Sequence, residues 1–143
     1  MKRLVFLFVL LTTAFHFSCS SDDADQSIDD YLKANNLTAQ KTEDGLYYII
    51  DVPGNDTKPK VNSTVRVKYE GKLLNGDVFD KSDDFKTSLS NVIAGWRRGM
   101  VLFGEGGKGT LIIPPSLGYG SQAVGAIPAN SVLIFDVELL EVF

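Results

Sequence analysis

The sequence predicts an α+β domain built from several strands and one short internal helix. Apolar and charged residues alternate from Val65 to Lys72, which is typical of a strand with one buried face. A longer stretch, 132–142, has the same alternation, and every second residue from Leu133 to Leu139 is apolar. Between these strands, only Ile93 to about Leu102 has the pattern of a helix. Antiparallel strands around one short helix are an arrangement that this pattern permits.

Turn-forming residues divide the rest of the chain into further strands. Residues 46–52 form an apolar stretch that ends at the turn cluster Pro53-Gly54-Asn55-Asp56. Asn75-Gly76 follows the alternating stretch and predicts a hairpin turn, because both residues tolerate the positive φ angles of tight turns. Residues 109–113 predict one more strand. We therefore expect residues 46–143 to form one domain, a length that supports a hydrophobic core.

A short helix is predicted before this domain, within an appendage at residues 27–45. Ser27 can cap its first turn, and Ile28, Tyr31 and Leu32 fall on one face of a helix that runs to about Ala34. A helix this short is marginal in isolation, so its apolar face needs a surface to cover it. The surface could belong to its own domain, to a second copy or to another protein, and docking on its own domain is favoured.

The N-terminal residues have the layout of a secretory signal. Lys2 and Arg3 precede the apolar run 4–11, and small and aromatic residues lead up to Cys19. The run is shorter than the roughly 20 apolar residues that cross a bilayer. We therefore expect residues 1–18 to be a signal peptide and the acidic stretch 19–26 to be a linker.

Composition excludes several classes of function for the mature chain. Loss of Lys2 and Arg3 from the 14 basic residues would leave 12 against 18 acidic residues, with no basic run for a phosphate backbone. Nucleic acid is therefore not an expected partner. The one histidine, His16, lies in the signal, and the one cysteine is Cys19. The site is expected to work without a disulfide, a metal ion or a cofactor.

Five motifs, taken together, carry a resemblance to a known family. In chain order they are V-x-V-x-Y-x-G from Val65, Phe79-Asp80, VIAGW at 92–96, IPPSLGYG at 113–120 and IPANSVLIFDVELL at 127–140. Over about the last eighty residues the chain resembles the FKBP-type peptidyl-prolyl cis/trans isomerases. The resemblance implies an antiparallel sheet wrapped around one short helix. It also implies a pocket for proline-containing polypeptides and for macrolides of the rapamycin type.

The resemblance assigns roles to seven residues, and the apolar residues Phe85, Val92 and Ile127 of the chain can complete the walls of the pocket. Trp96 would be the floor under the proline ring, Asp80 a buried carboxylate facing the substrate, and Tyr119 a hydrogen-bond donor through its hydroxyl. The backbone N–H of Ile93 would anchor a substrate carbonyl. The remaining wall residues would be Tyr69, Phe79, Phe85, Val92, Ile127 and Phe135. We expect Asp80, Tyr119 and Phe79 to be catalytic and the others to bind substrate.

The chemistry of proline isomerisation suits such a pocket. Rotation about an X-Pro amide faces a barrier of about 18 to 20 kcal/mol, which comes from amide resonance. Resonance places negative charge on the carbonyl oxygen, and water that is hydrogen-bonded to this oxygen strengthens the resonance. A dry aromatic pocket therefore disfavours the planar amide more than the twisted one. Neither a nucleophile nor a proton transfer is needed.

The chain departs from the family pattern at two places near the site. The segment from Lys81 to Asn91 is several residues shorter than in the familiar small members, and an arginine that often partners the aspartate is absent there. Lys81 is the nearest candidate to replace it. We interpret the carboxylates of this segment, Asp80, Asp83 and Asp84, as a solvated acidic turn rather than a calcium loop. The loop 121–126 is one residue short and carries Val124.

Cys19 followed by Ser20, Ser21 and two aspartates resembles the acylation site of bacterial lipoproteins. A simple cleaved signal with a leftover thiol is the alternative. The sequence thus predicts a lipid-anchored prolyl isomerase of the cell envelope, attached to the outer membrane on its periplasmic or outer surface, that assists exported proteins. The alternatives are a non-catalytic module that binds proline segments or acts as a chaperone, and an adaptor that dimerises through the short helix.

Overall fold

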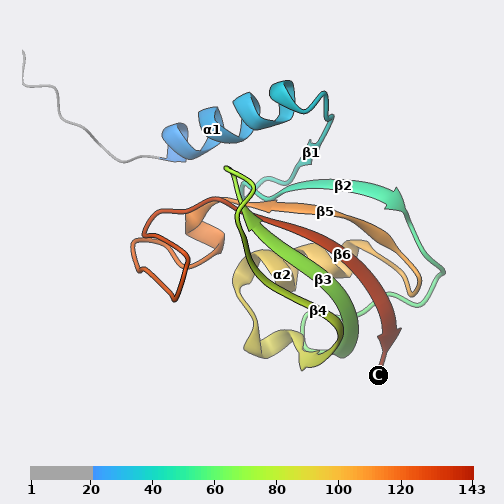
Figure 1. The fold of residues 1–143 in the computed structure, drawn as a ribbon. Helices are drawn as coiled ribbons and strands as arrows, with labels where there is room; N and C mark the ends of the chain where they lie inside the picture. Colours follow the sequence, from blue (N-terminus) through green and yellow to red (C-terminus); the bar gives the residue numbers. More distant parts are fainter. Residues whose placement is uncertain (1–20) are drawn as a thin grey trace, which may run out of the picture.

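The structure is a computed structural model that describes residues 21–143 (Figure 1). Six antiparallel strands form one sheet in the order β1-β2-β5-β6-β3-β4. The strands are β1 (Gln40–Lys41), β2 (Tyr47–Val52), β3 (Thr64–Leu73), β4 (Val78–Ser88), β5 (Lys108–Ile113) and β6 (Leu133–Val142). The helices are α1 (Ser21–Ala34) and α2 (Ala94–Gly99), with 3₁₀ turns η1 (Leu89–Asn91), η2 (Met100–Leu102) and η3 (Pro115–Leu117). The predicted α+β class is confirmed.

The curved sheet wraps around α2, as Figure 1 shows. Trp96 and Met100 project from the α2–η2 segment into a core that includes Leu111 and Phe135. Two glycines allow the close approach, because a Cβ at Gly95 or Gly99 would lie within 3.0 Å of side-chain atoms of β5. The helix predicted over 93–102 corresponds to α2 together with η2.

The sequence failed to predict two strands, β1, which joins the sheet from within the expected appendage 27–45, and the longer β4. The interpretation of Asp80, Asp83 and Asp84 as an acidic turn is wrong, because all three lie within this 11-residue strand. Asp83 pairs with Lys68 of β3 at 2.7 Å, and this contact lowers the pKa of the Asp83 carboxyl. The charged side chains are accommodated because β4 is an edge strand with few buried residues.

Helix α1 begins at Ser21, so the expected linker 19–26 is helical from that residue onward. Ser27 is not an N-cap, since its hydroxyl lies in mid-helix and donates to the carbonyl of Asp23 at 2.9 Å. The predicted end at Ala34 is confirmed, and Asn36 adopts a positive φ of 52° just beyond it. The acidic run 22–25 explains the earlier start, because carboxylates stabilise the N-terminal turn of a helix.

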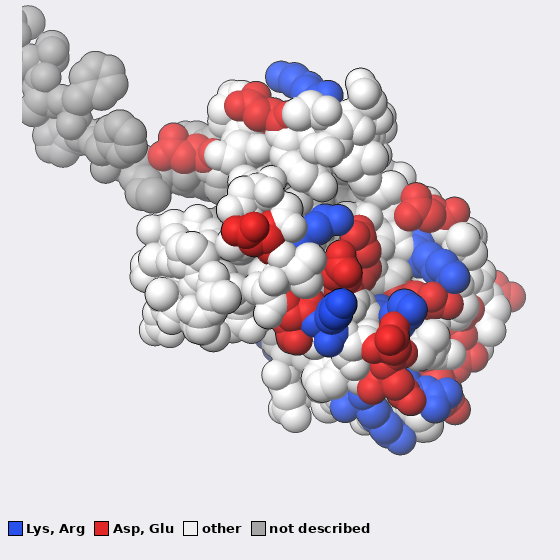
Figure 2. All heavy atoms as spheres, viewed as in Figure 1, with Lys and Arg blue, Asp and Glu red and all other residues white. Residues whose placement is uncertain are grey.

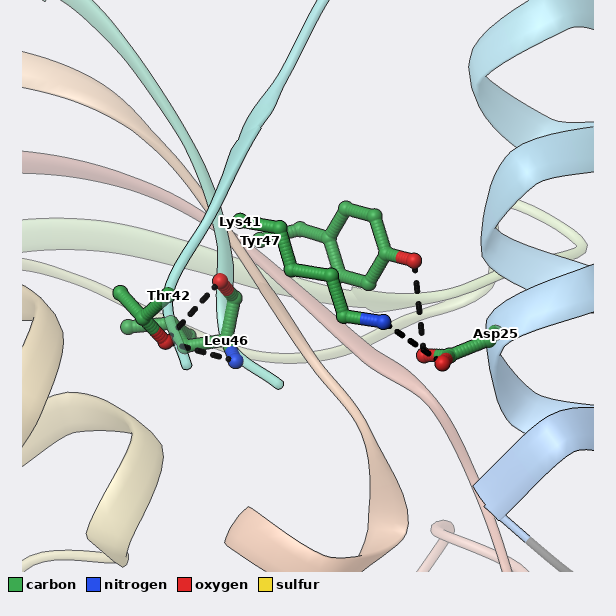
Figure 3. A network of polar contacts seen from close by, with 5 residues as sticks. All are labelled: Asp25, Lys41, Thr42, Leu46 and Tyr47. Carbon is green, nitrogen blue, oxygen red and sulfur yellow. Dashed lines mark hydrogen bonds and ion pairs between the residues drawn. The ribbon is translucent and has the colours of Figure 1, made fainter. Parts of the chain in front are cut away.

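The apolar face of α1 docks on the outer face of its own sheet. Ile28 and Leu32 pack against Ile112 and Ile134, whose neighbours in sequence point to the opposite face, toward α2. Polar contacts reinforce this docking (Figure 3). Asp25 of α1 lies 2.6 Å from Nζ of Lys41, and this hydrogen bond raises the pKa of Lys41.

Charged side chains cover much of the remaining outer face of the sheet, and Figure 2 shows the two signs interspersed there. Representative cross-strand pairs are Lys72–Asp136 at 2.7 Å and Lys108–Glu138 at 3.1 Å. Within residues 21–143, no helix is both long and apolar enough to cross a membrane. The expected signal peptide and the acylation site at Cys19 lie outside the described residues.

Candidate functional site

The ten residues assigned from the sequence line one cavity of about 460 Å³. They come from β3, β4, the start of α2, the loop after η3 and β6, so the fold assembles segments spread from Tyr69 to Phe135. The volume lies within the range of small-ligand sites. The cavity also has four lining residues that the sequence did not assign: Asn91, Val124, Gly125 and Ala126.

Trp96 is the centre of the aromatic wall. Its side chain is 4% exposed, and its ring lies edge-to-face with Tyr69 at 5.0 Å and with Phe135 at 5.3 Å between centroids. Phe79 is edge-to-face with Phe135 at 5.5 Å, and Phe85 with Tyr69 at 5.7 Å. Edge-to-face contacts hold each ring against the next, so the wall is a connected and largely preformed surface.

The indole Nε1 of Trp96 adds one polar group to this wall. The atom is buried and has no hydrogen-bond partner among the described residues. A buried donor without an acceptor is costly.

Two irregularities in β4 bring Phe79, Asp80 and Phe85 to the same cavity. Successive residues of a regular strand point to opposite faces, so Phe79 and Asp80 would ordinarily diverge. The register with β3 slips by one residue between Gly71 and Lys72, beside Phe79, and again between Val67 and Tyr69. Each slip is a bulge with an extra residue on β4. The bulges re-aim the side chains, and all three residues line the cavity.

Asp80 differs from expectation in its exposure and its partner. The side chain is exposed rather than buried, because it lies on the edge strand at the mouth of the cavity. Lys81 does not replace the missing arginine, since no ion pair joins Asp80 to a basic residue in the part of the chain that the structure describes. Instead the hydroxyl of Tyr69 donates to Asp80 Oδ2 at 2.7 Å. Burial, followed by this hydrogen bond, raises the pKa of Tyr69 to about 12.

Two further hydrogen-bond donors belong to residues that line the cavity. Ile93 is the residue before α2, and its backbone N–H has no backbone acceptor among the described residues. Tyr119 is held on a tight turn, because Gly118 and Gly120 both donate their N–H groups to the carbonyl of Pro115. The Tyr119 side chain is 39% exposed, so its hydroxyl is accessible from the cavity and from solvent.

The loop after Tyr119 closes one end of the cavity with a miniature hairpin. Val124 and Ile127 exchange two backbone hydrogen bonds of 2.9 Å, and Gly125 supplies the positive φ of 55° that this turn requires. Ile127 is thereby buried in the wall, while Val124 is 40% exposed at the rim. The sequence marked Val124 as unusual but gave no signal that Gly125 and Ala126 also contribute.

The cavity contains no cluster of metal ligands. Residues 21–143 hold no group of three or more histidine, cysteine or carboxylate side chains that could bind a metal ion. The arrangement instead combines a desolvating aromatic wall, donors for carbonyl groups and one carboxylate. It can bind a compact apolar ring and a polarised carbonyl at the same time.

This fold and this cavity define a member of the immunophilin class, and comparison with known proteins identifies the family. Residues 55–140 match the family of FKBP-type peptidyl-prolyl cis-trans isomerases. The chain belongs to this family, which confirms the resemblance seen in its motifs.

Several curated relatives are FkpA proteins. The FkpA of Buchnera aphidicola (from Schizaphis graminum) is 48% identical over 107 residues, which are 71% of this chain and 42% of the relative. Escherichia coli FkpA is 44% identical over 102 residues, 68% of this chain and 38% of the relative. The chain therefore spans less than half the length of these proteins.

Solved structures share the fold. The crystal structure of Escherichia coli FkpA gives a TM-score of 0.76 at 37% identity, covering 85% of this chain and 59% of that one. A peptidyl-prolyl cis-trans isomerase from Pseudomonas syringae gives 0.73 at 28% identity, covering 87% of this chain and 97% of that one.

Proposed function

We propose that this protein catalyses cis/trans isomerisation of X-Pro bonds in polypeptides and that the aromatic cavity is its active site. The observation that carries the proposal is the convergence on one cavity of ten residues, nine of them from five separate motifs. A proline ring packed on Trp96 would bring its amide among the rings of Tyr69, Phe79 and Phe135. Water would be displaced from the carbonyl oxygen, which disfavours the planar amide relative to the twisted one.

The polar groups of the cavity would have different tasks. The N–H of Ile93 and the hydroxyl of Tyr119 would hold substrate carbonyls and so contribute to binding. The Asp80 carboxylate, positioned by the Tyr69 hydroxyl, would lie near the rotating amide once substrate covers it. Its negative charge opposes the charge that resonance puts on the planar carbonyl oxygen. This repulsion falls as the amide twists, which assists turnover rather than binding.

A protease-coupled assay on a panel of X-Pro peptides tests the proposal. We expect catalysis above the uncatalysed rate and inhibition by rapamycin, because the cavity residues match those implied for macrolide binding. The control is Trp96→Leu, which keeps an apolar side chain but removes the flat floor, and we expect it to lose most of the activity. Folded protein without activity or rapamycin binding would refute the proposal.

We also propose that the protein acts on exported polypeptides while anchored to the cell envelope through an acylated Cys19. The support is the residue pattern of the N-terminal segment, with its basic start, apolar run and cysteine followed by small and acidic residues. In this arrangement α1 starts only two residues after the anchor, so the domain would work close to the membrane surface.

A further inference from the structure

A second and larger cavity of about 780 Å³ lies beside the proposed active site. It is a groove between the N-terminal half of α1, the β1–β2 turn, the β3–β4 hairpin and the loops at 114–120 and 130–132. None of the assigned site residues lines this groove. It is an additional binding surface that the isomerase chemistry does not use.

The two walls of the groove differ in charge. Four acidic residues line the groove, Asp23 and Asp25 from α1 and Glu43 and Asp44 from the β1–β2 turn, and Lys41 is its one basic lining residue. Asp25 is paired with Lys41, and Asp44 with Arg98 of α2. Asp23 and Glu43 are exposed and have no ion pair within 4.0 Å among the described residues.

Outside α1 and the β1–β2 turn, the lining of the groove is uncharged. Most of it belongs to the stretch 109–135, which contains no lysine, arginine, aspartate or glutamate, and the rest to residues 73–75. Figure 2 shows the corresponding lobe as a surface free of charged side chains, and Figure 1 places that lobe at the same end of the sheet as the start of α1. Half-buried Leu73, Leu74 and Pro115 give this side of the groove apolar contact area, whereas Pro114 and Val132 are buried. A groove with one apolar and one acidic wall suits an extended segment that carries lysine or arginine.

The groove adjoins the proposed active site across the loop 119–130, which lines both. Tyr119 lines the aromatic cavity, and the next residue, Gly120, lines the groove. Farther along the same loop, Ile127 belongs to the cavity and Asn130 to the groove, and the N–H of Asn130 donates to the carbonyl of Gly120 at 2.8 Å. A chain that leaves the cavity beside Tyr119 would reach the groove by passing over this loop.

We propose that the groove is an extended substrate site that binds the polypeptide flanking the proline and favours flanks containing lysine or arginine. The proposal rests on the proposed isomerase function, since it assumes that the proline occupies the aromatic cavity. Four to six extended residues span about 13 to 22 Å, so a short flank can follow the groove. Asp23 and Glu43 are the carboxylates that would attract its positive charges.

The test compares peptides that share one X-Pro core but differ in a five-residue flank. The flank is neutral, carries two lysines or carries two aspartates, and is placed on either side of the core. Each exposed ion pair is worth about 0.2 to 1 kcal/mol, so two pairs should raise kcat/KM about two- to thirtyfold over the neutral flank at low salt. The ratio should fall toward one at high ionic strength, and the acidic flank should be the poorest.

Two double variants with the same change in net charge separate the groove from general electrostatics. The double variant Asp23→Asn with Glu43→Gln should reduce the ratio of kcat/KM between the basic-flank and neutral-flank peptides to near one. Asp29→Asn with Asp56→Asn removes two exposed carboxylates that do not line the groove, and should keep most of the ratio. Equal ratios in the two variants, or no preference in the unmodified protein, would overturn the proposal.

Fluorescence anisotropy with the same peptides distinguishes this failure from failure of the isomerase function. If no peptide is turned over, the isomerase proposal is refuted, but the ratio of Kd values between the neutral-flank and basic-flank peptides still tests the groove. If turnover is normal but the Kd ratio is one, only the groove proposal falls. A dimer in sedimentation that the Asp23 and Glu43 variant dissociates would assign the groove to a second copy and likewise overturn the proposal.

Discussion

Gly71 packs against the rings of Phe79 and Phe135 in the aromatic wall, and replacing it by alanine should push these rings into the cavity. A Cβ at this position would lie 2.7 Å from Cε1 of Phe135 and 2.7 Å from Cε2 of Phe79. Carbon atoms normally pack at about 3.5 to 4.0 Å, so each ring must retreat by about 1 Å. Both rings line the cavity, and their retreat alters the space that a proline would occupy.

The cost in stability can be estimated from the same geometry. Overpacking a core site by one methyl group costs about 1 to 3 kcal/mol. Alanine recovers about 0.5 to 1 kcal/mol, because glycine loses more backbone entropy on folding. The expected net loss is about 1 to 2 kcal/mol, or a fall in Tm of about 4 to 10 °C. At 10 °C the variant should remain folded, and we expect at least a tenfold loss of kcat/KM there.

Gly99→Ala is the matched control for this experiment. A Cβ at Gly99 would lie 2.5 Å from Cδ1 of Leu111, so it is also overpacked, but neither residue lines the cavity. We expect this variant to lose comparable stability and to keep its kcat/KM and rapamycin affinity. If Gly71→Ala retained full activity, or if both variants lost activity in proportion to stability, the reasoning about the wall would be refuted.

Three further predictions concern the polar groups and the anchor. Tyr119→Phe should weaken peptide and rapamycin binding with little change in kcat, whereas Asp80→Leu should lower kcat more than affinity; two fully active variants with unchanged Tm would remove both residues from the site. Because the folded pKa of Tyr69 is raised to about 12, its stabilising effect is complete below pH 10 and is lost as the pH rises through 12. Urea midpoints should therefore fall over that range more steeply than in Tyr69→Phe, while turnover should vary little between about pH 6 and 8.5. Cys19→Ala should abolish labelling by a fatty-acid probe, and continued labelling would contradict the proposed acylation site.

Much of the fold could be predicted because its signals are local. The strands β3 and β6 show alternating apolar residues, and β2 and β5 are short apolar stretches. The Asn75-Gly76 dipeptide has the residue types of a tight hairpin turn. Helix α1 was placed correctly at its C-terminal end, where its apolar face meets the sheet. Its start was predicted six residues too late, because an acidic run can be read either as a solvated linker or as the first turn of a helix.

The exposure of Asp80 could not be predicted from the motifs, since it depends on where the edge of the sheet lies. The motifs identify which residues meet, but the position of β4 at the edge follows from the pairing of all six strands. The same pairing gives Asp80 a hydroxyl partner from β3, the hydroxyl of Tyr69, rather than a basic one from its own strand. The chain thus keeps a hydrogen bond to this carboxylate although the family's arginine is absent.

The bulges in β4 explain why local rules fail at the site itself. Without them, strict alternation from Phe85 would put Phe79 on the cavity side and turn Asp80 outward. The two slips instead allow Phe79 and Asp80 to line the same cavity. They interrupt the regular pairing of β3 with β4 beside Gly71 and Lys68. No sequence pattern in 78–88 signals such slips, because the strand is exposed and lacks apolar periodicity. The strand with the least regular pairing therefore supplies the carboxylate of Asp80 and the aromatic side chains of Phe79 and Phe85. Such irregularity is expected where the geometry of a site, and not folding alone, determines the course of a strand.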